Sequence, residues 1–447
     1  MGRARRETAV GTDPAPRALS PGSVPEGPGA AARRAARAGL YVHVPFCAAR
    51  CTYCDFSSGL FSSAGVERWL AGVEREAVRR GPAASGLVFS SVFLGGGTPS
   101  TLTPRHVHRL FGALRRSFAI SPDAEITLEA NPESVEARRL AAWRAVGANR
   151  LSIGAQSFLG PELAALGRVH APAGPGRAIA LARSHGFARL SLDLMFGFPG
   201  HTLENWRTSL ECALELAPEH LSAYAFIPEP GTPLGEAVLS GRAGVLPDEE
   251  QAEAYALFLE RAARAGLGSY ETSNVCRPGA EARHNLVYWL CRPYVALGPS
   301  AHGLLRGGRY GNHRDFSRWA EALERGVWPE AEREPENAAT RAREILMLGL
   351  RLTSGVRAAD YAPALWSETT RRYGEALAQA VATGRLIATR DGFALPRALR
   401  YLADDVLAWI EARAEAHGFD SRSAHSVPWD SCRIPPSSAT GAAPIRR

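Results

Sequence analysis

The sequence predicts an α/β protein with a partial barrel of six parallel strand–helix units and a smaller, mainly helical domain after it. Two observations predict this fold class. Short apolar runs, each followed by a segment with helical spacing of Ala, Leu, Glu and Arg, recur six times between residues 40 and 227, and the alternation stops near residue 275. Strand–helix repeats of this kind require a parallel sheet with right-handed crossovers. Six units are too few to close an eight-stranded barrel.

The predicted strands are the runs at 40–46, 91–94, 125–130, 150–154, 189–196 and 220–227. Apolar periodicity predicts helices at 66–80, 104–118, 134–146 and 203–216. Beyond residue 275, further helical patterns occupy 315–326, 338–352 and 368–384, and the segment LIATRDGFAL predicts a short hairpin. Chemistry in parallel sheets collects at the carboxyl ends of the strands.

These patterns divide the chain into four parts. Residues 1–39 are rich in Ala, Arg, Pro and Gly without a hydrophobic period, so we expect a disordered extension, and we expect a disordered tail at 413–447. The barrel is expected over 40–270 and the C-terminal domain, which carries the motif described below, over 271–412.

Charge argues against a nucleic-acid partner. The formal net charge is +7 and all 52 basic residues are Arg. Residues 1–39 hold seven Arg against three acidic residues, and residues 413–447 hold five against three, which leaves about +1 for the 373 residues between them. A nearly neutral body does not present the basic surface that nucleic-acid binding requires. Arginine-only usage fits a GC-rich genome.

Localisation follows from what the sequence lacks. It contains no apolar stretch of eighteen residues, so we expect no membrane span. The N-terminus lacks the apolar core of a secretory signal, and we predict a cytoplasmic protein. A mitochondrial presequence is a minor alternative, because the Arg-rich start is interrupted by Glu7, Asp13 and several prolines.

Three cysteines carry the strongest chemical signal. Cys47, Cys51 and Cys54 are spaced C-x3-C-x2-C in the loop after the first predicted strand. Three thiolates on an iron–sulfur cube leave one iron open for a substrate or cofactor. Two alternatives stay open: a structural zinc site with His43 as the fourth ligand, and a redox pair of Cys51 and Cys54.

The segment HVPFCAARCTYCDF resembles the cluster motif of radical S-adenosylmethionine (SAM) proteins. More narrowly, residues 40 to about 400 resemble the oxygen-independent coproporphyrinogen III oxidases and the related heme chaperones of the HemW type. The resemblance implies a [4Fe–4S] cluster on Cys47, Cys51 and Cys54, with SAM on the open iron.

Polar residues at successive strand ends fit a SAM site. Glycines in Gly95-Gly96-Gly97-Thr98-Pro99 let the backbone approach a ligand, and a carboxylate suits ribose hydroxyls. A charge embedded in an apolar strand, as at Asp193, is costly without partners. The resemblance implies SAM contacts from these strand ends and their flanking residues, namely Tyr41, Tyr53, Gly96, Gly97, Thr98, Glu129, Gln156, Arg168 and Asp193. Simple packing is an equal alternative for the two tyrosines.

Two features separate the family branches. The oxidases carry a further cysteine two positions after the third ligand, where this chain has Phe56. The segment HNLVYW matches the H-N-x-x-Y-W motif of the chaperones, which implies heme binding by His284, Asn285, Tyr288 and Trp289. In a helix, His284 and Tyr288 share one face. His302, Cys276 and Cys291 are alternative axial ligands, and ordinary aromatic packing is the competing interpretation.

We therefore predict a heme chaperone that binds a [4Fe–4S] cluster, SAM and heme and delivers heme to an acceptor protein of unknown identity. The alternative is a radical SAM coproporphyrinogen III oxidase in porphyrin biosynthesis, which Phe56 disfavours, so enzymatic activity is left open. A zinc- or nucleic-acid-binding module is the third hypothesis. A homodimer is one possible assembly, and we expect no nucleic acid and no membrane span.

Overall fold

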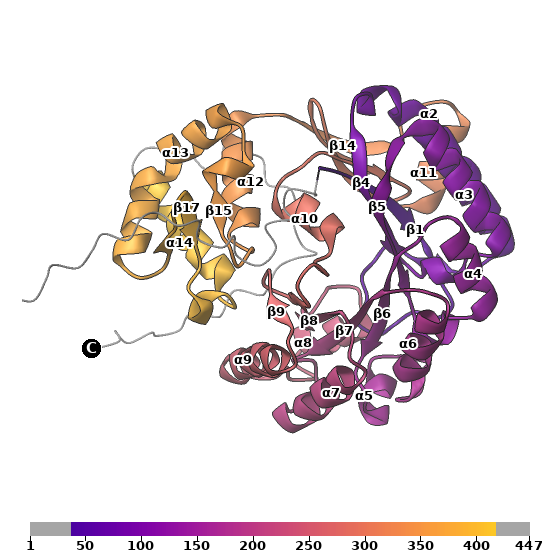
Figure 1. Ribbon diagram of the computed structural model, residues 1–447, viewed down its shortest axis with the longest axis horizontal. Coiled ribbons are helices and arrows are strands. Elements are labelled where there is room, and N and C mark those ends of the chain that lie inside the picture. Colours follow the sequence, from indigo (N-terminus) through magenta and orange to yellow (C-terminus); the bar gives the residue numbers. More distant parts are fainter. Residues whose placement is uncertain (1–36, 417–447) are drawn as a thin grey trace, which may run out of the picture.

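The computed structural model describes residues 37–416, and one curved sheet of twelve strands organises them (Figure 1). The strand order is β14-β13-β12-β11-β1-β4-β5-β6-β7-β8-β10-β9. The six predicted parallel strands lie side by side at its centre: β1 (Ala38–Val44), β4 (Val88–Gly96), β5 (Ala119–Ala130), β6 (Arg150–Gln156), β7 (Arg189–Phe196) and β8 (His220–Ala225). The predicted partial α/β barrel is confirmed.

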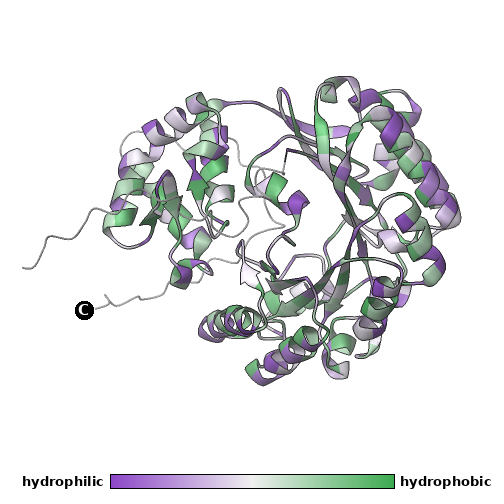
Figure 2. Cartoon of the chain, viewed as in Figure 1, coloured by the Kyte–Doolittle hydropathy of each residue, from purple (hydrophilic) through white to green (hydrophobic). Residues whose placement is uncertain are grey.

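Helices cover the outer face of this sheet (Figure 1). Four of the helices after the central strands begin at a Ser or Thr whose side chain accepts a backbone N–H of the first turn: Ser62, Thr103, Thr202 and Thr232. Figure 2 shows their polar sides turned outward and their apolar sides toward the sheet. The helices after the central strands are α2 (Ser63–Arg80), α3 (Pro104–Ser117), α4 (Ala137–Ala145), α5 (Gly160–Ala165), α6 (Gly174–Ser184), α7 (Leu203–Glu215), α8 (Pro233–Leu239) and α9 (Asp248–Arg264).

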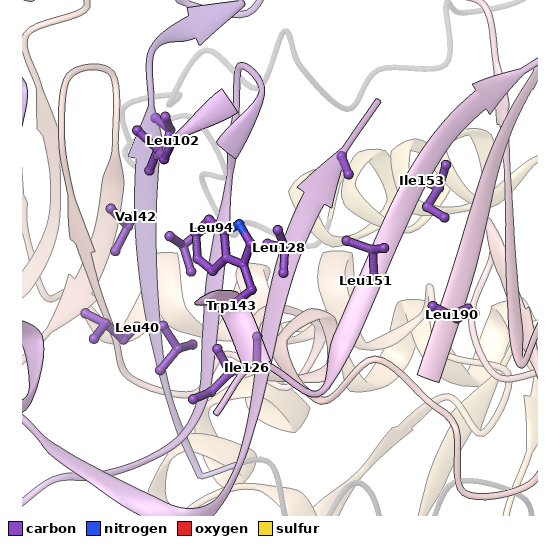
Figure 3. Close-up of a cluster of buried hydrophobic side chains, with 14 of the residues drawn as sticks. Leu40, Val42, Leu94, Leu102, Ile126, Leu128, Trp143, Leu151, Ile153 and Leu190 are labelled. Carbon is purple, nitrogen blue, oxygen red and sulfur yellow. The ribbon is translucent and has the colours of Figure 1, made fainter. Parts of the chain in front are cut away.

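The main core lies between the sheet and these helices. Alternate strand residues such as Leu40 and Val42 on β1 and Leu151 and Ile153 on β6 are fully buried there (Figure 3). Trp143 of α4 packs into the same cluster. Because successive strand residues point to opposite faces, the residues between them line the inner face. The core thereby fixes which side chains face the interior of the partial barrel.

The sheet does not end where the strand–helix alternation ends. Two short antiparallel strands extend it beside β8: β10 (Asn274–Cys276) and β9 (Gly268–Ser269). Beyond β1 it continues through β11 (Tyr294–Leu297), β12 (His302–Leu305), β13 (Gly308–Asn312) and β14 (Glu330–Pro335). Part of the range 271–412 thus belongs to the main sheet. Antiparallel neighbours need no crossover helix, so they leave no strand–helix period in the sequence.

A compact unit with its own core follows this sheet (Figure 1). It contains α12 (Ala338–Gly349), α13 (Pro363–Ala382) and α14 (Ala403–Ala416). A small sheet joins them, with β15 (Val356–Arg357), β17 (Gly392–Ala394) and β16 (Ile387–Ala388). The last two strands form the hairpin expected in LIATRDGFAL.

The segments expected to be disordered lie almost entirely outside the described residues. At their inner ends, β1 already begins at Ala38 and α14 continues to Ala416. No helix within residues 37–416 has the length and apolarity needed to cross a membrane.

A buried ion pair within α2 connects this helix to residues that follow β11 in the chain. Arg80 Nε donates to Glu76 Oε1 at 2.8 Å, and both side chains are almost completely buried. The other oxygen, Glu76 Oε2, accepts from Gly298 N at 2.9 Å and from Trp319 Nε1 of α11 (Phe316–Glu324) at 3.1 Å. Because its hydrogen bonds are satisfied, this charged group is tolerated in the interior.

The close packing of α11 on α2 predicts that one added methyl group destabilises the fold. A Cβ on Gly72 would lie 2.5 Å from the Trp319 ring. We expect Gly72→Ala to lower the free energy of unfolding by about 1–3 kcal/mol, the usual cost of overpacking. The matched control Gly112→Ala, on α3, meets only the end of a flexible arginine and should be neutral or stabilising. Equal stabilities in denaturant titrations would contradict this packing.

Candidate functional site

The site begins where the end of β1 meets the glycine loop after β4. Gly97 N donates to Val44 O at 2.8 Å and Thr98 N to Phe46 O at 2.7 Å. A Cβ at position 97 would lie 2.6 Å from Phe46 O, and Gly96 has a φ of +99° with its missing Cβ 2.4 Å from the His43 ring. Both glycines are therefore required by close backbone approach.

Cys47 lies on the two-residue strand β2 (Phe46–Cys47), which pairs with β3 (Gly59–Leu60). Cys51 and Cys54 follow in the loop between these strands. This loop extends from the carboxyl edge of the sheet, where the site was predicted.

A line of hydrogen bonds connects two of the cysteines through residues that follow β4, β5 and α5. Thr98 Oγ1 donates to Cys47 Sγ at 3.6 Å and accepts from Asn131 Nδ2 at 3.2 Å. Asn131 Oδ1 accepts from Arg168 Nη2 at 2.6 Å, and Arg168 Nη1 donates to Cys51 Sγ at 3.3 Å. Asn131 was missed by the sequence analysis, although it lies in the Leu-Glu-Ala-Asn-Pro segment that ends β5. The line fixes both sulfurs relative to the sheet.

The three thiols of the predicted cluster motif lie close together in this loop. Burial raises the pKa of the Cys54 thiol to about 11, and the nearby Cys51 and Cys47 sulfurs raise it as well, so the three are neighbours. Yet in the described part of the chain no three His, Cys, Asp or Glu side chains converge closely enough to hold one metal ion.

His43, the fourth ligand of the zinc alternative, is engaged elsewhere. Its Nε2 lies 2.9 Å from Ser57 O and its Nδ1 lies 3.0 Å from the Tyr41 hydroxyl. Because a carbonyl only accepts, Nε2 carries the proton and Nδ1 accepts from Tyr41. Burial lowers the pKa of His43 to about 4, so the ring is neutral. Both ring nitrogens are thus engaged, Nε2 by the loop that carries the cysteines and Nδ1 by Tyr41 on β1.

Two carboxylates stand at the same edge. Glu129 Oε2 accepts from Gly96 N at 3.2 Å, and burial, followed by the neighbouring Asp193, raises the pKa of Glu129 to about 8. Burial also raises the pKa of Asp193, against the effect of the serine hydroxyls of Ser222 and Ser152, the latter at 2.9 and 3.1 Å. Hydrogen-bond donors such as hydroxyls stabilise the ionised form of a buried carboxyl group.

Gln156 ends β6 in a conformation that other residues must maintain. Its φ is +64°, and the register of β6 against β7 shifts between Gly154 and Gln156. Left-handed backbone at a residue with a side chain costs on the order of 1–3 kcal/mol and clusters at functional sites. Arg168 Nη2 donates to Gly154 O at 2.8 Å and supports this turn.

The two predicted tyrosines differ in their surroundings. Tyr53 is half-buried against a small apolar cluster that includes Leu166 and Met195, and it lies beside Arg168 and Cys51. Tyr41 points to the inner face of the sheet, where its ring stacks on Phe93 with centroids 6.3 Å apart.

The predicted heme motif forms α10 (Arg283–Trp289), which lies on the inner face of the sheet, opposite the covering helices (Figure 1). His284 is 1% exposed. Its Nδ1 lies 2.9 Å from Ser91 Oγ and its Nε2 2.8 Å from the Tyr288 hydroxyl. Burial lowers the pKa of His284 to about 3. Asn285 is half-buried on the same helix.

Aromatic rings bring the two predicted residue sets together. The Phe93 ring lies 5.3 Å from His284 and the Tyr41 ring 6.5 Å from His284. Trp289 is not part of this group, because it packs toward α12 with Arg351 over its ring at 6.0 Å. Tyr41 of the first predicted set is therefore in ring contact with His284 of the second.

Of the alternative heme ligands, His302 lies apart from the aromatic group around His284, and Cys276 and Cys291 are buried. His302 is exposed on β12, with Nε2 3.0 Å from Glu332. Cys276 and Cys291 are buried, and burial raises the pKa of Cys291 to about 12. Ser152, Ser191 and Ser222 were not predicted either; their only signal is the polar residue two positions before each of them, Arg150, Arg189 and His220, on the same face of the strand.

Comparison with known proteins places the chain among radical SAM proteins. The model of the radical SAM superfamily matches residues 41–213. The heme chaperone HemW of Mycobacterium tuberculosis is 37% identical over 321 residues, which covers 71% of this chain and 82% of that protein. HemW of Bacillus subtilis is 34% identical over 317 residues, covering 71% and 84%. The structure of coproporphyrinogen III oxidase (HemN) from Escherichia coli matches with a TM-score of 0.72 at 20% identity, covering 85% and 93%.

The raised pKa of Glu129 predicts a pH-dependent stability. The folded chain holds this proton up to about pH 8, whereas the ordinary pKa is 4.5, so the folded state binds more protons in between. Stability then falls as pH rises through this window, by up to about 1.4 kcal/mol per pH unit. We expect Glu129→Gln to lose less stability than the wild type between pH 5 and 8 in anaerobic, SAM-free denaturant titrations. The exposed control Glu253→Gln should follow the wild type, and parallel curves for all three would contradict the assignment.

Proposed function

The chain belongs to the HemW family within the radical SAM superfamily, and on this premise we propose that it is a heme chaperone that binds a [4Fe–4S] cluster, SAM and heme and delivers heme to an acceptor protein. The observation that carries the proposal is 34–37% identity to HemW heme chaperones over more than four fifths of their length. The oxidase is not proposed, because it shares the fold at only 20% identity. Phe56, half exposed in the cluster loop, supports the same choice.

We assign the cluster to Cys47, Cys51 and Cys54. The bound cluster would supply an electron to the sulfonium of SAM. The protein's own contribution is orientation: Thr98 and Arg168 hold two of the sulfurs, and the glycines leave space beside them. This arrangement supports SAM binding by the remaining residues at the carboxyl edge, namely Tyr41, Tyr53, Gly96, Gly97, Glu129, Gln156 and Asp193.

We assign the heme to α10: His284 would supply a nitrogen ligand to its iron, and Asn285, Tyr288 and Trp289 are the other residues of the motif that we propose to bind it. Because both ring nitrogens of His284 are hydrogen-bonded, coordination requires one of them to exchange its partner. The Tyr288 hydroxyl is the simpler one to release, because it lies on the same short helix. Heme loading is then a local rearrangement of α10.

The compartment and assembly complete the proposal. Thiolate ligands of an iron–sulfur cluster fit a reducing compartment, so we propose the cytoplasm. The mitochondrion is the alternative, since a Bos taurus relative at 36% identity is named a mitochondrial radical SAM domain protein. Light scattering of the protein loaded with cluster and heme would show whether a monomer or a homodimer meets the acceptor.

Removal of one cysteine tests the cluster. In anaerobically reconstituted protein, we expect Cys51→Ala to lose most of the iron–sulfur absorption band and bound iron, because one iron loses its thiolate. Cys212→Ala on α7, a free cysteine away from the loop, should retain both. A colourless protein that binds stoichiometric zinc would contradict the assignment.

Heme titration tests α10. We expect His284→Ala to bind heme about tenfold more weakly or worse, a loss of at least about 1.4 kcal/mol. Tyr288→Phe should bind as well as the wild type or better, because its hydroxyl no longer competes for Nε2. His302→Ala serves as the control and should bind normally. Unchanged affinity in His284→Ala, with loss in His302→Ala, would move the heme to β12.

A further inference from the structure

A line of hydrogen bonds crosses the barrel interior from Tyr270 to Asp193. The Tyr270 hydroxyl lies 2.9 Å from His220 Nε2, and His220 Nδ1 lies 2.8 Å from Ser191 Oγ. Ser191 Oγ donates to Asp193 Oδ1 at 3.4 Å. The residues come from β7, β8 and the segment between β9 and β10, so the line exists only in the folded sheet.

The hydrogen-bond donors along this line are all oriented from Tyr270 toward Asp193. Ala282 N donates to the Tyr270 hydroxyl oxygen at 3.3 Å, and a backbone N–H can only donate. The best-satisfied arrangement therefore sends the tyrosine proton to His220 Nε2. Nδ1 then carries the ring proton and donates to Ser191, whose hydroxyl donates to Asp193. The carboxylate, which only accepts when ionised, ends the line.

If one side chain of this line were removed, water could not take over its hydrogen bonds, because the residues are buried. Ser191 is 0%, His220 2% and Tyr270 4% exposed. In such an interior a donor or acceptor that loses its partner stays unpaired, which is costly. A change at one end is therefore felt at the other.

The two ends belong to different parts of the site. Asp193 is one of the carboxylates of the proposed SAM site. Ala282 is the residue before α10, and it has no side-chain cap of its own. The helix start is held instead by Tyr270 and by Glu125, whose Oε1 accepts from His284 N at 3.2 Å. The line thus joins the SAM edge to the helix of the heme motif.

The charged groups around the line favour this single arrangement. Arg150, 3% exposed and with Nη2 unpaired among residues 37–416, lies near both His220 and Asp193. Its charge opposes protonation of His220 and favours the ionised Asp193. Glu129 on β5 and Tyr224 on the neighbouring strand β8 also interact electrostatically with Asp193.

We propose that Tyr270 and His220 are positioning residues that couple the SAM site to α10, so that SAM and heme change each other's affinity. This inference rests on the proposed function. Linkage requires the effect to be reciprocal, and couplings of this kind typically change affinity about 5- to 150-fold. A merely structural role would affect stability or both affinities without changing their dependence on each other.

The test measures the heme dissociation constant of the cluster-loaded, full-length protein with and without saturating SAM. We expect a ratio of about tenfold in the wild type. Tyr270→Phe removes one hydroxyl without changing any residue assigned to either ligand, and it should bring the ratio close to one. Ser191→Ala breaks the line at a second place and should do the same. Tyr255→Phe is the matched control, since its buried hydroxyl donates to Thr272 O outside the line, and it should keep the wild-type ratio.

Two results would overturn the coupling alone: a wild-type ratio of one with both ligands bound, or an unchanged ratio in a folded Tyr270→Phe protein. The same loss in Tyr255→Phe would also overturn it, because the effect would not be specific to the line. A wild-type protein that binds neither SAM nor heme would instead overturn the proposed function, and the coupling with it.

Discussion

The site depends on two backbone hydrogen bonds between the glycine loop after β4 and the end of β1. They fix the start of the cluster loop against the sheet, since the carbonyls of Val44 and Phe46 flank the strand that carries Cys47. The same loop places Thr98 at the sulfur of Cys47 and the Gly96 amide at Glu129. Any side chain at position 97 would separate the two segments, and the contacts of the sulfur, the carboxylate and the loop would be lost together.

The central sheet divides its two faces between stability and chemistry. On β6, Leu151 and Ile153 pack under the helices, whereas Arg150 and Ser152 face the interior. The outer face makes the apolar contacts that stabilise the fold. The inner face can therefore carry costly features, such as a buried guanidinium and two carboxyl groups with raised pKa values, without endangering the sheet.

The sequence predicted the parts of the molecule that local pattern determines. Six apolar runs separated by helical periods correspond to the six central strands, and the cysteine spacing marks the cluster loop. The added strands β11–β14 were not foreseen. β11, which is parallel to β1, has only four residues, and the antiparallel strands β12–β14 after it carry no crossover signal. Asn131 and the contact between Tyr41 and His284 were missed for another reason. They arise only when strands and a helix that are distant in the chain are packed together, which no local period encodes.

An open sheet also has to avoid pairing with another copy of itself, a hazard that closed barrels do not face. The two edges of this sheet prevent such pairing in different ways. β9, at one edge, has two residues and offers almost no backbone to a neighbour. β14, at the other, carries Glu332, Arg333 and Glu334 and ends at Pro335, so an added strand would meet charges and a missing donor. The partial barrel can thus stay open without becoming a template for aggregation.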